Sequence, residues 1–203
     1  MTAGPLTVPA RVTRTLWLVR HGESEWNALG LCQGQMPAPG LTARGRRQAE
    51  RCAEAMAGEP VGLLLTSDLA RAQETAAPIA RALGIEVVTD PRLRERSLGE
   101  AEGFPSALLG PDRSGLGRRR VVDPDAAPAG GESVRQLYER VVGCVSERLG
   151  DGLGDLALVC HGGVVRVLLA WIAGESPETM AWPKVRNGLP TRVVAGTPTP
   201  PDP

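Results

Sequence analysis

Short apolar runs alternate along this chain with longer amphipathic segments, and this alternation limits the fold more than any other feature. Buried strands are predicted at 15–19, 61–65, 85–88 and 156–160, and helices at 42–57, 68–83, 134–145 and 164–173. Strands that are apolar throughout and separated by helices form largely parallel sheets covered on both faces. The expected fold class is therefore α/β, a three-layer α/β/α arrangement with a mostly parallel sheet and helices on both faces.

Polar residues at the predicted helix starts support these boundaries. Thr42 and Ser67 are expected to be N-caps, because a hydroxyl can accept the unpaired amide hydrogens of the first turn. Ser133 with Gln136 fits a capping box before the helix that begins at Val134. Ser176-Pro177 predicts one more short helix near the end of the chain.

The length of 203 residues suits one domain of ordinary size. We expect a flexible N-terminal segment at 1–14, a single catalytic domain at 15–195 and a proline-rich tail at 196–203. The stretch 105–131 is rich in Gly, Pro and Arg with little periodicity, which predicts a loop or lid inserted in the domain.

Charge and cysteine usage narrow the class of protein. Lys plus Arg and Asp plus Glu are both 23, and a formal net charge of zero argues against a dedicated nucleic-acid or membrane binder. No apolar run approaches the ~20 residues of a membrane span. The four cysteines, Cys32, Cys52, Cys144 and Cys160, lack metal-site spacing. We therefore expect reduced thiols and a cytoplasmic location.

The only two histidines follow two of the predicted strands. His21 comes after Arg20 at the end of the first strand, and His161 comes after the fourth. Ligands of such sheets bind beyond the carboxyl ends of the strands, where Arg71 and the amides of Gly162 and Gly163 are also expected. Guanidinium groups and free amides suit a dianion of phosphate size. They would repel a metal ion, so no metal is expected.

The strings around these residues resemble the signature of the histidine phosphatase superfamily, which includes the cofactor-dependent phosphoglycerate mutases. Matching strings occur in the family's order from about Thr15 to Ala173, so the resemblance spans nearly the whole predicted domain and implies a phosphoglycerate mutase-like fold. They are Arg20-His21-Gly22-Glu23-Ser24-Glu25-Trp26-Asn27, Gln33-Gly34, Leu41-Thr42, Thr66-Ser67-Asp68-Leu69-Ala70-Arg71-Ala72, Leu93-Arg94-Glu95, Gly130-Gly131-Glu132-Ser133 and Val159-Cys160-His161-Gly162-Gly163.

The resemblance also implies roles for single residues. His21 would be the nucleophile that carries a transient phosphoryl group, and Glu95 the general acid for the leaving oxygen. Arg20, Arg71 and His161 would hold the phosphoryl oxygens. Asn27 and the amide of Gly162 would add neutral donors, while Gln33 and Gly34 would touch the non-reacting part of the substrate. No cofactor is implied.

This chain departs from the family pattern at several positions. Pro37 stands near the place where many members have Asp, and Gly40 looks inserted before Leu41, which puts the conformation of this loop in doubt. Ala101 replaces an aromatic residue that is common in family phosphatases, so one wall of the substrate mouth is expected to be open. Ser97 and Leu98 replace the residues that continue the mutase pattern, and the mutase tyrosine is absent.

These features favour a phosphatase that acts on a small-molecule phosphate monoester, with a sugar phosphate or a phosphoglycerate derivative as the leading candidates. Two alternatives stay open: a phosphoglycerate mutase primed by 2,3-bisphosphoglycerate, and a catalytically silent scaffold that docks a partner through its tail. A short insertion rich in Gly and Pro favours a site open to water and hence hydrolysis. Arg113 and 118–120 could contact a second anionic group, although a solvated basic loop is the simpler interpretation. A homodimer also stays open.

Overall fold

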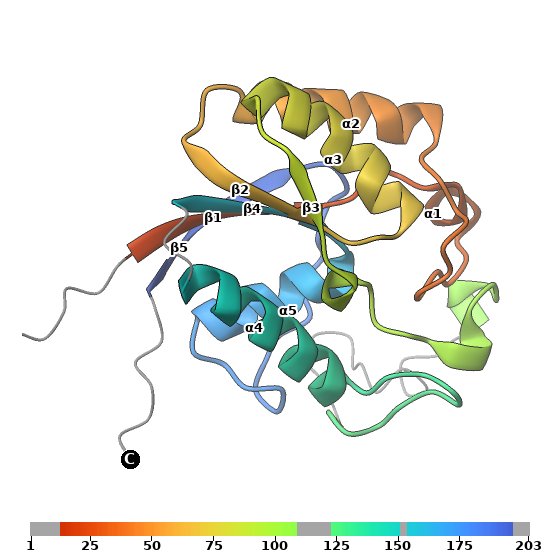
Figure 1. The fold of residues 1–203 in the computed structure, drawn as a ribbon. Coiled ribbons are helices and arrows are strands. Elements are labelled where there is room, and N and C mark those ends of the chain that lie inside the picture. Colours follow the sequence, from red (N-terminus) through yellow and green to blue (C-terminus); the bar gives the residue numbers. More distant parts are fainter. Residues whose placement is uncertain (1–12, 109–122, 151–153, 197–203) are drawn as a thin grey trace, which may run out of the picture.

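A five-stranded sheet forms the centre of the molecule (Figure 1). The computed structural model describes residues 13–108, 123–150 and 154–196. The strands are β1 (Thr13–Arg20), β2 (Val61–Thr66), β3 (Val87–Thr89), β4 (Asp155–Cys160) and β5 (Pro190–Gly196), in the order β3-β2-β4-β1-β5. β1, β2, β3 and β4 are parallel to one another, and β5 pairs with β1 in the antiparallel sense. The predicted α/β class with a mostly parallel sheet is confirmed.

Two pairs of helices cover the two faces of the sheet. Figure 1 shows α2 (Ala43–Met56) and α3 (Ala70–Leu83) on one face, and α4 (Val134–Gly150) and α5 (Gly162–Ile172) on the other. Side chains alternate along β1, because successive residues of a strand point to opposite faces. Leu16 and Leu18 join the core under α4 and α5, while Trp17 and Val19 join the core under α2 and α3. The apolar runs of the sequence thus supply both cores at once.

Two of the three predicted helix caps are present. The Thr42 side chain accepts the amide hydrogen of Gly45 at 3.0 Å. Ser133 and Gln136 form the reciprocal pair of a capping box, at 2.8 and 3.1 Å. Ser67 is not the cap of α3, whose N-cap is Leu69 without a side-chain hydrogen bond. α3 begins later than predicted, and the Ser67 hydroxyl accepts from the Leu69 amide one residue before the helix.

Short elements complete the description of the chain. They are α1 (Glu25–Leu29) and three 3₁₀ turns, η1 (Pro91–Leu93), η2 (Gly99–Ala101) and η3 (Ser106–Leu108). The helix predicted at Ser176-Pro177 was wrong: hydrogen bonds from Thr179 and Met180 back to Ser176 close a single turn there.

Two strands extend into segments that were predicted to lie outside the domain. β1 begins at Thr13, inside the segment predicted to be flexible, and its Arg14 pairs with Ala195 of β5. β5 itself was not predicted and ends at Gly196, the first residue of the predicted tail. Within the insertion predicted at 105–131, residues 109–122 lie outside the described part of the chain. Arg113 and residues 118–120 are among them. Within the described ranges no helix is both long and apolar enough to cross a membrane.

Candidate active site at the carboxyl ends of β1 and β4

The two histidines meet because their strands are neighbours in the sheet. β1 and β4 pair in parallel with Arg20 opposite Cys160, and the amide of His21 donates to the Cys160 carbonyl at 2.9 Å. His21 and His161 therefore leave the sheet side by side, with ring centroids 5.2 Å apart. Both side chains are buried. The expectation that the strand ends bring the two imidazoles together agrees with this geometry.

The ring of His21 is held in one orientation and one tautomer. Its Nδ1 lies 2.7 Å from the carbonyl oxygen of Gly22. A carbonyl can only accept, so Nδ1 carries the hydrogen and Nε2 keeps its lone pair. Burial holds the pKa of His21 well below its usual value, the charges of Arg71 and Arg20 lower it further, and the bond to Gly22 opposes them. His21 is thus a neutral imidazole near pH 7.

Two guanidinium groups flank the imidazoles. Arg71 lies in the first turn of α3 and donates from Nη1 to the Met36 carbonyl at 2.8 Å and from Nη2 to the Gly34 carbonyl at 2.9 Å. Arg20 donates from Nη1 to the Val185 carbonyl at 2.8 Å. Burial lowers the pKa of Arg71 to about 10, although nearby carboxylates oppose the effect. Both groups stay cationic at neutral pH.

Several buried nitrogen atoms of the two arginines and of His161 have no hydrogen-bond partner within the described ranges. They are the Nε atoms of Arg20 and Arg71 and both ring nitrogens of His161. A buried polar atom without a partner costs on the order of 1–3 kcal/mol. Because an oxyanion bound at the strand ends would accept these hydrogen bonds, the arrangement fits a phosphate group.

A single carboxylate completes the group, which we call the strand-end cluster: Arg20, His21, Arg71, Glu95 and His161. The two carboxylate oxygens of Glu95 accept the amide hydrogen of Gly163 at 3.1 and 3.0 Å, at the N-terminus of α5. Its charge opposes the lowering of the pKa of Arg20 and Arg71 that burial causes. The cluster therefore holds two fixed cations, two neutral imidazoles and one carboxyl group.

The remaining predicted residues lie around this cluster. Asn27 accepts at Oδ1 from the Ser24 amide at 3.3 Å within the capping box of α1. Gln33 accepts at Oε1 from the Ser24 hydroxyl at 2.7 Å, and Gly34 offers its carbonyl to Arg71. Gly162 lies against the Arg20 side chain, since a Cβ on it would be 3.5 Å from Arg20 Nε. Gln33 and Gly34 thus also support the loop that holds Arg71.

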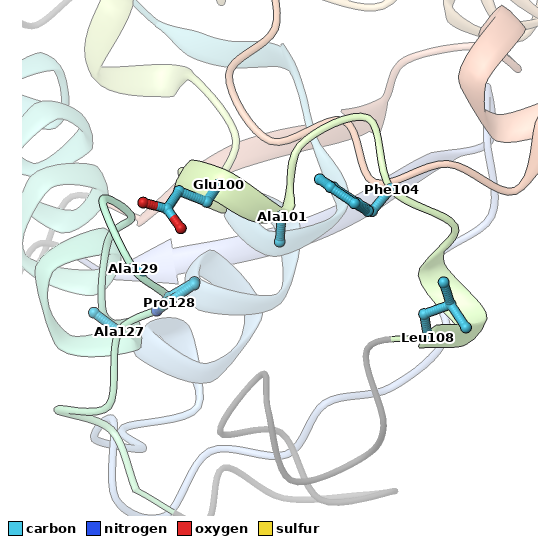
Figure 2. A pocket seen from close by; sticks show the side chains of 7 residues that line it. All are labelled: Glu100, Ala101, Phe104, Leu108, Ala127, Pro128 and Ala129. Atoms are coloured by element: carbon cyan, nitrogen blue, oxygen red, sulfur yellow. The ribbon is translucent and has the colours of Figure 1, made fainter.

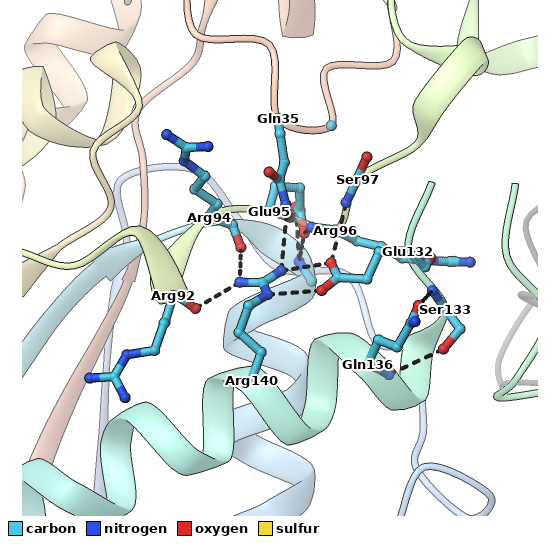
Figure 3. A network of polar contacts seen from close by, with 12 residues as sticks. Gln35, Arg92, Arg94, Glu95, Arg96, Ser97, Glu132, Ser133, Gln136 and Arg140 are labelled. Carbon is cyan, nitrogen blue, oxygen red and sulfur yellow. Dashed lines mark hydrogen bonds and ion pairs between the residues drawn. The ribbon is translucent and has the colours of Figure 1, made fainter. Parts of the chain in front are cut away.

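Sequence reasoning missed several residues that contact the cluster. Asn187 donates from Nδ2 to the His21 carbonyl at 2.9 Å and to Asn27 Oδ1 at 3.2 Å. It precedes β5, which had no recognisable pattern, so no signal pointed to it. Arg140 of α4 donates to the Glu95 carbonyl, and Glu132 accepts from the Ser97 amide (Figure 3). The Gly-Gly-Glu-Ser string contains Glu132, but nothing in it indicates what the carboxylate binds.

A cavity of about 540 Å³ lies beside η2 and η3. Figure 2 shows its lining, in which Ala101 and Phe104 face Pro128 across an open space. Ala101 therefore forms part of the wall of a cavity, and its expected place at the substrate mouth stays a prediction. Across the described residues, no group of three or more His, Cys, Asp or Glu side chains comes together that could hold a metal ion.

Comparison with known proteins identifies the family to which this chain belongs. The profile of the histidine phosphatase superfamily (branch 1) matches residues 16–196. This chain belongs to the histidine phosphatase superfamily. A relative from Yersinia enterocolitica, named "Probable phosphoglycerate mutase GpmB", is 37% identical over 180 residues, which cover 88% of this chain and 83% of the relative. The resemblance seen in the sequence is thus confirmed, and the chain is a histidine phosphatase.

Solved structures of histidine phosphatases share its fold. A protein titled "Mycobacterial hydrolase 1" superposes with a TM-score of 0.78 at 29% identity over 90% of this chain and 91% of the other. A mycobacterial glucosyl-3-phosphoglycerate phosphatase superposes with a TM-score of 0.75 at 28% identity, again over 90% and 91% of the two chains. In both cases the superposed residues make up nine tenths of this chain, so the similarity covers nearly the whole fold.

Proposed function

We propose that this chain is a metal-independent phosphomonoester hydrolase that works through a phosphohistidine on His21. The observation that carries the proposal is the state of His21, a buried and neutral ring whose Nδ1 hydrogen is held by Gly22. A neutral imidazole with a free Nε2 is a nucleophile. The unpartnered donors of Arg20, Arg71 and His161 are suited to the charge of a phosphoryl group.

The reaction proceeds in two displacements. In the first, Nε2 of His21 attacks phosphorus, the bond from phosphorus to the ester oxygen breaks, and protonated Glu95 gives its proton to that oxygen. In the second, the Glu95 carboxylate takes a proton from a water molecule as the water oxygen attacks phosphorus. The nitrogen–phosphorus bond then breaks, and inorganic phosphate and neutral His21 are released.

The other residues bind and orient the phosphoryl group in both displacements. Arg20, Arg71 and His161 donate to its oxygens, and Asn27 and the Gly162 amide add neutral donors. Gln33 and Gly34 contact the alcohol part of the ester. Since the two guanidinium cations of the cluster outnumber its one carboxyl group, the cluster repels a metal ion, and the reaction needs none.

The substrate is a small phosphorylated metabolite, either a sugar phosphate or a phosphoglycerate derivative. The similarity to a glucosyl-3-phosphoglycerate phosphatase supports this class, because that protein's name combines a sugar with a phosphoglycerate. The cavity beside η2 supports a substrate larger than a bare three-carbon ester. The predicted cytoplasmic location and homodimer stay predictions.

The test is hydrolysis of a chromogenic phosphate monoester in excess EDTA. We expect full activity with EDTA, and a loss of at least ~10³-fold in kcat for His21→Ala. An acid-labile phosphoprotein should be trapped from the wild type and not from this variant. Arg81→Gln, which alters an exposed ion pair with Glu50, is the control and should keep full activity. Activity that disappears with EDTA, or survives in His21→Ala, would contradict the proposal.

A phosphoglycerate mutase is the second candidate, and the name of the Yersinia relative favours it. The two functions differ in the fate of the phosphoryl group. A mutase requires a bisphosphate primer and releases no inorganic phosphate, whereas the hydrolase needs no primer and releases one phosphate per turnover. Measuring phosphate release from 3-phosphoglycerate with and without 2,3-bisphosphoglycerate separates them.

A further inference from the structure

The backbone that carries Glu95 is irregular and depends on side chains for its position. Between η1 and η2 it belongs to neither a helix nor a strand. Arg140, which projects from α4 and is 20% exposed at its side chain, supplies three hydrogen bonds to this backbone (Figure 3). Its Nη1 donates to the carbonyls of Arg92 and Arg94 at 2.7 and 3.0 Å, and its Nη2 donates to the carbonyl of Glu95 at 3.3 Å.

A second carboxylate fixes the guanidinium of Arg140. Glu132, whose side chain is 14% exposed, accepts from Nε of Arg140 at 2.8 Å and from its Nη2 at 2.6 Å. This two-pronged geometry is available to arginine and not to lysine. Glu132 also exchanges backbone and side-chain hydrogen bonds with Ser97, at 3.0 and 3.3 Å. Together Arg140 and Glu132 hold the chain immediately before and after Glu95.

The carboxyl group of Glu95 is held from the opposite side. Its oxygens accept from the Gly163 amide at the N-terminus of α5, while its main chain rests on Arg140 of α4. The placement of this one carboxyl group therefore depends on two helices that pack against each other on the same face of the sheet.

We propose that Arg140 and Glu132 are positioning residues that aim the Glu95 carboxyl group at the oxygen of the leaving group. The proposal rests on the proposed function, in which Glu95 is the general acid. Neither residue reacts; they act by fixing the Glu95 backbone. A displacement of about 1 Å can cost as much as ~10²-fold in rate, so loosening this support weakens proton transfer without removing the acid.

A defect in proton transfer depends on the leaving group. An alkoxide needs a proton as it departs, whereas 4-nitrophenolate leaves readily without one. General acid catalysis supplies ~10²- to 10⁴-fold where it is needed. The second displacement, in which Glu95 acts on water, is the same for both esters, whereas kcat/KM reports only the first. Loss of positioning should therefore lower kcat/KM for an alkyl phosphate and spare it for 4-nitrophenyl phosphate. A merely structural defect would lower kcat/KM for both.

The experiment compares Arg140→Lys and Glu132→Gln with the wild type on glycerol phosphate and 4-nitrophenyl phosphate. Arg140→Lys keeps the charge and loses the fork, and Glu132→Gln keeps the shape and loses the charge. We expect kcat/KM for glycerol phosphate to fall ~10- to 100-fold in both variants, and kcat/KM for 4-nitrophenyl phosphate to fall less than ~3-fold. Arg135→Gln is the matched control, since Arg135 lies on the same helix in an exposed ion pair with Asp125 and should change neither rate.

The Glu95→Gln variant separates this inference from the proposed function. It should show the same preference for 4-nitrophenyl phosphate, and adding Arg140→Lys to it should cause no further loss. Equal losses of kcat/KM on both esters in Arg140→Lys and Glu132→Gln would overturn the positioning role. If Glu95→Gln itself lacks the leaving-group preference, the general acid is wrong and the proposed function fails. If thermal unfolding shows that one of the two variants, Arg140→Lys or Glu132→Gln, is misfolded, the other variant tests the positioning role.

Discussion

His21 and His161 are uncharged because they are buried, and the proposed reaction depends on this charge state. For both His21 and His161, burial is the largest cause of a pKa held well below the usual value, and Arg71 is the next. A charged imidazole here would be desolvated and would face a guanidinium. The same surroundings that keep the His21 ring uncharged, as the proposed nucleophile requires, therefore make acid conditions unfavourable for the folded chain.

This effect predicts how stability depends on pH. Below about pH 6.5 the unfolded chain binds a proton at each histidine and the folded chain does not, so the free energy of unfolding falls as the pH falls. The slope approaches ~1.4 kcal/mol per pH unit for each buried histidine. In His161→Asn one of the two contributions is lost, and we expect about half of the wild-type slope between pH 5 and 6.5. Urea unfolding measures this, and equal slopes would contradict it.

At the scale of the elements, the N-terminus of α5 binds the side chain of Glu95. Gly163 supplies the amide that both carboxylate oxygens accept. A Cβ at this position would overlap Glu95 Oε1 and lie 3.2 Å from Glu95 Cδ and from Leu137 Cδ2. Only glycine lets the carboxyl group approach the helix this closely.

Gly163→Ala should therefore displace Glu95. We expect kcat for an alkyl phosphate to fall at least ~10-fold, because the carboxyl group moves away from the leaving oxygen. Gly143→Ala is the matched control: Gly143 lies inside α4, and a Cβ there would meet nothing within 4 Å. It should stabilise the protein by ~0.5–1 kcal/mol without changing kcat. A fully active Gly163→Ala enzyme would show that Glu95 does not need this contact.

At the scale of the whole molecule, the cavity beside η2 is assembled from parts that are distant in the sequence. Residues 100–108 form one side and residues 127–129 the other. Its η2 side is joined to the loop around Arg71, because Glu102 accepts the amide hydrogen of Gln35 at 2.9 Å. Through Glu102, the η2 side of the cavity is thus connected to the loop whose carbonyls hold the Arg71 guanidinium.

Filling this cavity should change which esters are accepted. We expect Ala101→Trp to raise KM for a glycosylated phosphoglycerate ~10-fold or more, and to leave KM for glycerol phosphate within ~2-fold, since one pocket contact discriminates by ~10- to 200-fold. Ala55→Trp, an equal change at an exposed position of α2, is the control. Steady-state kinetics on both esters check this, and an unchanged KM for the larger ester would place its alcohol part elsewhere.

Local patterns in the sequence determined most of the framework. The apolar runs located β1, β2 and β4, and the capping box of Ser133 and Gln136 located the start of α4, because these features depend on neighbours within four residues. The helices between the strands imply that β1 and β4 run in the same direction, so both histidines are expected at one edge of the sheet. The order of the strands, in which β4 lies between β2 and β1, was decided by the fold, and it places His21 beside His161.

Tertiary packing decided the rest. β5 is an edge strand that starts at Pro190; Val193 and Ala195 face the core, but Val194 between them is exposed and apolar, so no alternation of apolar and polar residues indicated the strand. Asn187, Glu132 and Arg140 contact the backbone of residues between 35 and 166 positions away in the chain. A polar side chain in a sequence has many potential partners, and only the folded chain brings one of them within hydrogen-bond distance.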